Sequence, residues 1–167
     1  MTEKENLEIS AAKIFCHCYQ KAVGARAQFQ RLNSPPLPDA TCKIGDKHID
    51  IEIAHLFGSG LDAQRLLGRK RRVPFSEETL MKQRIIPLNL RLTSELNHIL
   101  KNKSEKSYQT EKVWLVIRNG FPLWGKEDFE DYSSEILFPE MHPFEKIWLI
   151  CDPRGCSGLL ELCVQPN

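Results

Sequence analysis

The sequence predicts an α/β domain in which helices cover a mixed central β-sheet. Three observations lead to this fold class: an amphipathic helical pattern near the N-terminus, a short hairpin after it, and two continuous apolar runs further along. Continuous apolar runs are typical of strands that are buried on both faces. Helices packed on such strands cover them most simply. At 167 residues, the chain predicts a single domain over 1–167 with a sizeable core.

A long helix is predicted from residue 3 to about residue 31. Apolar side chains recur there at intervals of three and four residues, which makes one stripe along a helix. The stripe comprises Leu7, Ala11, Ile14, Phe15, Cys18, Tyr19 and Ala22. Pro35, Pro36 and Pro38 prevent any continuation, because proline lacks a backbone donor and pushes its predecessor into extended geometry. The chain is therefore expected to enter Asp39 in an extended conformation.

Residues 41–44, the pair Gly45-Asp46 and residues 47–57 predict a strand, a tight turn and a second strand. Side chains alternate between the two faces of a strand. The face expected to pack on the first helix carries Ile49, Ile51 and Ile53. The opposite face carries His48, Asp50, Glu52 and Ala54.

The remaining chain predicts an insertion, two helices, two buried strands and an edge strand. In order, these are the insertion at about 58–90, a helix at 91–108, a buried strand at 112–118, a short helix near 126–132, a second buried strand at 146–151 and an edge strand near 159–164. Trp114 and Trp148 fall in the buried strands and are expected in the core. Trp124 lies between them in a Pro-Leu-Trp-Gly segment and is expected to be exposed.

Composition and charge give no overall bias towards one class of partner. The chain is 41% hydrophobic and 27% charged, with a net charge of +1, so no global field attracts nucleic acid or a membrane. No segment approaches roughly 18 consecutive apolar residues, and the polar N-terminus does not resemble a signal peptide. A cytoplasmic location with no membrane partner is therefore expected, with the six cysteines reduced.

Two acidic residues occupy positions that a purely structural role explains poorly. Asp39 follows Pro38, and Glu52 lies among isoleucines in the second hairpin strand. A carboxylate beside so apolar a strand is costly unless a positive charge accompanies it, and hard divalent cations prefer carboxylate oxygens. Asp39 has a simpler alternative as the cap of a turn. Asp50 either supports the same site or faces Lys43 across the hairpin.

The order of these elements resembles the PD-(D/E)XK nuclease superfamily. The matching residues are Pro38-Asp39 at the start of the hairpin and Glu52-Ile53-Ala54 in its apolar strand, within a match over residues 5–118. The resemblance implies a restriction-endonuclease-like core in which Asp39 and Glu52 coordinate Mg²⁺ or Mn²⁺. It also implies a third acid from the first helix, for which Glu8 is preferred and Glu5 is the alternative. In that family the metal and a lysine activate a water that attacks a phosphodiester.

The sequence departs from that family at one position. Ala54 stands where the family has its lysine, and alanine can neither donate a proton nor stabilise a phosphate. Some members of the family take this lysine from the next core helix, where Lys103 and Lys106 are the candidates and Lys103 is taken as the catalytic residue. Polar substitutes from the insertion are Gln64 and Gln83.

The leading hypothesis is therefore a divergent Mg²⁺-dependent endonuclease acting on DNA or RNA, working as a homodimer. Its backbone-binding residues are expected in a basic run of the insertion, because cations near phosphates add salt-dependent affinity. The run comprises Arg65, Arg69, Lys70, Arg71 and Arg72. The alternative is a catalytically inactive nuclease-like domain that binds nucleic acid or a protein partner. A third hypothesis is an α/β interaction protein in which the acids are incidental.

Overall fold

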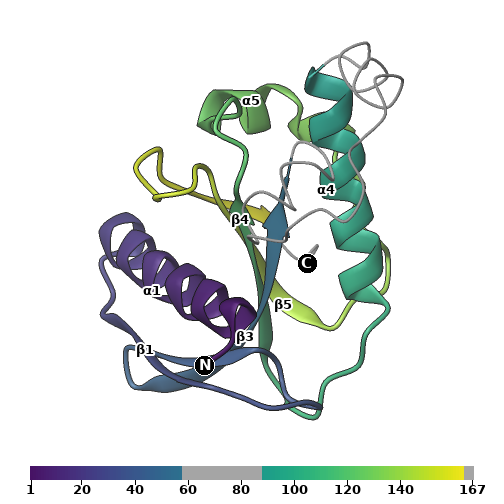
Figure 1. Ribbon diagram of the computed structural model, residues 1–167. Helices are drawn as coiled ribbons and strands as arrows, with labels where there is room; N and C mark the ends of the chain where they lie inside the picture. Colours follow the sequence, from purple (N-terminus) through teal and green to yellow (C-terminus); the bar gives the residue numbers. More distant parts are fainter. Residues whose placement is uncertain (58–87, 164–167) are drawn as a thin grey trace.

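The computed structural model describes residues 1–57 and 88–163, with six strands in one open sheet and helices beside it (Figure 1). The elements in chain order are α1 (Glu3–Val23), β1 (Ala27–Leu32), β2 (Ala40–Ile44), β3 (Lys47–Leu56), α4 (Leu88–Ser104), β4 (Val113–Asn119), α5 (Lys126–Asp131), the 3-10 helix η1 (Ser133–Glu135), β5 (Phe144–Ile150) and β6 (Leu159–Cys163). The predicted α/β class, with helices on a mixed sheet, is confirmed.

The sheet is mixed, and its strands lie in sequence order from β1 to β6. The first three strands form an antiparallel meander. The central pairs, β3 with β4 and β4 with β5, are parallel, and β6 returns antiparallel to β5 at the edge. β3 therefore joins the antiparallel half of the sheet to its parallel half.

The two faces of the sheet carry separate cores, with α1 on one side and α4 on the other (Figure 1). On the α1 side, Ile49, Ile51 and Ile53 pack with helix residues such as Phe15 and Tyr19. On the α4 side, the core comprises Ala54, Leu56, Leu92, Leu96, Leu100, Leu115, Ile117 and their neighbours. The predicted alternation along β3 is confirmed: the isoleucines face α1, while Ala54 faces α4.

The first helix is shorter than the sequence predicts. It begins with a capping box, in which Thr2 and Glu5 satisfy each other's backbone N–H groups, and it ends at Gly24 with a left-handed φ of 82°. The predicted continuation to residue 31 is wrong, because Ala27–Leu32 pair with β2 as an antiparallel strand. Hydrogen bonds to a neighbouring strand outweigh a weak local helical pattern. The later helix is also shifted, to Leu88–Ser104 instead of 91–108.

The predicted exposure of Trp124 is wrong as well. Trp124 is 3% exposed and meets the Phe121 ring edge-on, with centroids 4.6 Å apart. Its carbonyl accepts a hydrogen bond from the fully buried Asn119 amide at 2.9 Å, which folds the loop back over the end of β4. Trp114 and Trp148 are buried, as predicted.

Residues 58–87 of the predicted insertion lie outside the described residues. The same holds for Gln64, Gln83 and the basic run of Arg65, Arg69, Lys70, Arg71 and Arg72. Within the described ranges, no helix is long and apolar enough to cross a membrane.

Candidate functional site

The hairpin brings Asp39 and Glu52 side by side. Ala40 pairs with Ile51 in the antiparallel register of β2 and β3, so Asp39, one residue earlier, lies opposite Glu52. The Asp39 Oδ2 atom accepts the backbone N–H of Ile53 at 2.8 Å. This bond holds the Asp39 carboxylate against the backbone of β3 at Ile53, the residue that follows Glu52. The simpler interpretation of Asp39 as a local turn cap does not describe this contact, which spans the hairpin.

The helix α4 supplies Lys103 to the buried Glu52 carboxylate, and the segment after the helix supplies Lys106, which the sequence predicts on the helix itself. Lys103 Nζ lies 2.7 Å from Glu52 Oε1, and Lys106 Nζ lies 3.2 Å from the same oxygen. The Glu52 side chain is only 4% exposed, whereas those of Lys103 and Lys106 are 19% and 53% exposed. Lys103 is therefore the more enclosed of the two partners, and Lys106 joins the site from the solvent side.

The helix α1 carries Glu8, the acid that the resemblance favours as a third ligand. Glu8 is 8% exposed, and its carboxylate pairs with Lys4 one helical turn earlier at 3.3 Å. Glu5, the alternative, is exposed and belongs to the capping box with Thr2. Only Glu8 of these two acids is close enough to Asp39 and Glu52 for their charges to affect its pKa.

The three acids differ in their electrostatic surroundings. Burial and the negative charge of Glu52 raise the pKa of Asp39. Burial and the negative charge of Asp39 raise the pKa of Glu8. Burial also acts to raise the pKa of Glu52, but Lys103 and Lys106 together outweigh it, so the net shift is downward. Glu52 is thus held ionised, while Asp39 and Glu8 carry charge that their surroundings compensate less well.

Asp50 has a structural role on the same face. Its two carboxylate oxygens accept hydrogen bonds from Thr41 Oγ1 at 2.6 Å and Thr110 Oγ1 at 2.8 Å. Thr41 in turn bonds with the Asn33 amide, which links three segments of the chain. The expected pairing of Asp50 with Lys43 is not among the contacts of the described residues. The hydroxyls instead hold Asp50 in the sheet.

Tyr108 is a site residue that the sequence did not indicate. Its ring packs against Phe144, with centroids 6.0 Å apart, in the loop that follows α4. Its hydroxyl is buried without a hydrogen-bond partner in the described structure. Burial and the nearby Glu52 carboxylate raise the pKa of Tyr108. A single tyrosine after a helix gives no signal in sequence, because its approach to Glu52 depends on how α4 packs over β3.

The carboxylates suit a hard divalent cation in part. In the described ranges, no group of three or more His, Cys, Asp or Glu side chains is arranged to hold a metal ion. Asp39 and Glu52 nevertheless lie side by side across the hairpin, and each carries two carboxylate oxygens. Burial raises the pKa of Asp39 and of Glu8, and a cation bound beside them would oppose that shift. Carboxylate oxygens of this kind are the ligands that Mg²⁺ and Mn²⁺ prefer, and Asp39 and Glu52 are the residues that would hold such an ion.

Comparisons with protein-family models, curated proteins and solved structures found no match to this chain. The chemistry of the site therefore rests on its own residues.

Proposed function

We propose that this chain is a divergent metal-dependent nuclease that hydrolyses phosphodiesters in DNA or RNA. The observation that carries the proposal is the contact of Lys103 with Glu52, at 2.7 Å. Ala54 leaves the acid-bearing face of β3 without a cation, and a lysine from α4 reaches that face from another element. This arrangement supports a restriction-endonuclease-like core in which the lysine comes from the helix instead of from the strand.

Each residue of the proposed site has a chemical role that its surroundings favour. Asp39 and Glu52, with Glu8 as the third acid, would hold Mg²⁺ or Mn²⁺, and the metal would supply activation of a water and balance charge on the phosphate. Lys103 keeps Glu52 ionised and presents a cation beside it, where negative charge develops on a phosphate during cleavage. Lys106, more exposed, adds a second cation at the entrance.

A second function has its own observation in favour. Lys103 and Lys106 both donate a hydrogen bond to Glu52 Oε1. The described side chains form no group of three ligands for a metal ion. A nuclease-like domain that has lost catalysis and binds nucleic acid through its cations would retain these same contacts. The two functions differ in whether a divalent cation binds and whether cleavage follows.

A cleavage assay on single- and double-stranded DNA and RNA, with Mg²⁺, Mn²⁺ or EDTA, tests the proposal. The wild-type chain should cleave at least one substrate only when metal is present. Lys103→Ala and Glu52→Gln should each lower the rate by at least about 100-fold, as for groups that stabilise transition-state charge. Lys106→Ala should lower it much less, because that side chain is half exposed.

The matched control is Lys101→Ala, an exposed lysine of the same helix with no contact to Glu52 among the described residues. Thermal unfolding of each variant shows whether it still folds. Unchanged cleavage in folded Lys103→Ala would rule out the proposed catalytic lysine. Metal-independent nucleic-acid binding with no cleavage by the wild type would favour the second function.

A further inference from the structure

The sheet face that carries Glu52 continues beyond the site as an exposed polar surface. Phe29, Cys42 and Ile49 pack in the α1 core, so their neighbours in the strands point to the opposite face. These neighbours form a row across three strands, in which Gln28 pairs with Lys43 and Lys43 pairs with His48. The row is exposed.

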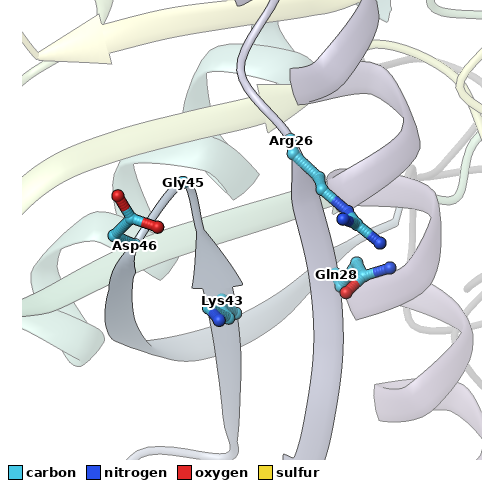
Figure 2. A pocket seen from close by; sticks show the side chains of 5 residues that line it. All are labelled: Arg26, Gln28, Lys43, Gly45 and Asp46. Carbon is cyan, nitrogen blue, oxygen red and sulfur yellow. The ribbon is translucent and has the colours of Figure 1, made fainter.

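A surface pocket of about 400 Å³ lies at the end of this row (Figure 2). It is lined by Arg26, Gln28, Lys43, Gly45 and Asp46. In Figure 2, the Arg26 side chain leaves the chain just before β1 and the Gln28 side chain leaves β1 itself, while Lys43 projects from the adjacent strand β2. Two cations and an amide donor therefore surround one pocket, with Asp46 as its single acid.

Among the described residues, no acid neutralises the cations of this pocket. Neither Arg26 nor Lys43 forms an ion pair with an acid of the described ranges, and the salt bridges there involve other lysines. Guanidinium, ammonium and side-chain amide groups are the donors that proteins use on phosphate oxygens. The pocket therefore has the chemistry of an anion site.

We propose that Arg26, Gln28 and Lys43 bind a backbone phosphate of the nucleic acid whose scissile phosphate reaches Glu52. This subsite rests on the proposed function, because the nuclease site defines the substrate. Asp39, which immediately precedes β2, and Lys43 within β2 are four residues apart on the same face, a separation of about 13 Å at ~3.3 Å per residue of extended chain. A nucleic-acid backbone a few nucleotides long spans such a distance. One substrate backbone can therefore cross both sites along β2.

The salt dependence of binding measures this contact directly. Binding of the full chain to a fluorescent duplex DNA and to RNA would be titrated in EDTA, which prevents metal-dependent cleavage, at several salt concentrations. The variant Arg26→Gln/Lys43→Gln should reduce the slope of log K against log salt by about 2, roughly 1 for each phosphate-contacting cation. Asp46→Asn, which removes the opposing acid, should tighten binding.

The charge-matched control is Lys21→Gln/Lys126→Gln, which removes two cations from α1 and α5. Its slope should stay close to that of the wild type. An equal loss of slope in both double variants would overturn the subsite in favour of diffuse attraction, and an unchanged slope in Arg26→Gln/Lys43→Gln would overturn it too. In both of those outcomes the wild type still binds, so they do not contradict the proposed function, which the cleavage assay tests separately. A wild-type chain that binds neither nucleic acid would contradict the proposed function together with the subsite.

Discussion

The Nζ atom of Lys103 lies 2.7 Å from Oε1 of Glu52, which joins α4 to β3 across 51 residues of sequence. The carboxylate is almost fully buried and the lysine is largely enclosed. Removing one partner of an ion pair in this setting costs much more than it does on the surface, because the other partner is left charged and desolvated. The contact therefore links the stability of the domain to the chemistry proposed for its site.

Lys103→Ala should lower the free energy of unfolding by about 1.5–3 kcal/mol at neutral pH, the value of a hydrogen bond to a charged group. The pKa of Glu52 is lowered in the folded state, so the stabilisation is present above the ordinary pKa of 4.5 and is lost as pH falls through the folded value. The difference between wild type and variant should therefore shrink in acid. Urea unfolding at pH 7 and at about pH 3 measures it, with Lys106→Ala as the milder comparison.

Asp39→Asn should make the metal-free protein more stable at neutral pH. The pKa of Asp39 is raised, so folding favours its protonated form, and stability falls as pH rises from the ordinary pKa of 3.8 through the folded value. Asparagine keeps an oxygen for the Ile53 N–H but carries no charge. Thermal unfolding in EDTA at pH 7 should show a higher Tm for the variant, and the gain should vanish below about pH 3.

The change in Tm on adding Mg²⁺ tests whether Asp39 is a metal ligand. Millimolar Mg²⁺ should raise the Tm of the wild type and leave that of Asp39→Asn unchanged, because a ligand stabilises only the state that binds it. Asp46→Asn, in the exposed β2–β3 turn, is the matched control and should respond to Mg²⁺ as the wild type does. Equal responses in Asp39→Asn and the wild type would exclude Asp39 as a ligand.

Asn119→Ala should destabilise the domain by roughly 2–4 kcal/mol, because it leaves several buried groups without partners. The Asn119 amide donates to the carbonyls of Trp124 and Cys151, each at 2.9 Å, and its oxygen accepts the N–H of Phe121. Chemical denaturation measures the loss. Asn102→Ala on the exposed face of α4 should change stability by less than about 0.5 kcal/mol. A similarly small effect at Asn119 would contradict this account of the loop.

Gly155→Ala should cost about 2–4 kcal/mol, for strain in the backbone and for a steric clash. Gly155 has a φ of 75°, and an added Cβ would lie 2.5 Å from Cys18 Sγ and 2.9 Å from Ile14 Cγ2. Gly45 has a φ of 60° and open space around it, so Gly45→Ala adds backbone strain without a steric clash. This variant should cost only about 1 kcal/mol. Equal losses in the two variants by chemical denaturation would show that contact with α1 contributes nothing.

Most of the sheet could be predicted from the sequence, because a buried strand needs an apolar run wherever it lies. Two of the strands were identified by the apolar runs around Trp114 and Trp148. The alternation of isoleucines with Asp50 and Glu52 identified β3 and showed which of its faces packs on a helix. β1 could not be found in this way. Its residues continue a helical pattern locally, and only pairing with β2 makes them a strand.

The sequence by itself determined that Asp39 and Glu52 share a hairpin and that Ala54 leaves their face without a lysine, since alternation along a strand is a local property. It named Lys103 and Lys106 as candidates and favoured Lys103, but it could not show that either lysine reaches Glu52. The tertiary structure decided that Lys103 is the closer and more buried partner of Glu52. It also decided that the charges of Asp39 and Glu52 affect the pKa of Glu8, and that Tyr108 lies near Glu52. Each of these depends on how α1 and α4 pack on opposite faces of β3. Packing is a relation between distant segments, which no local pattern encodes.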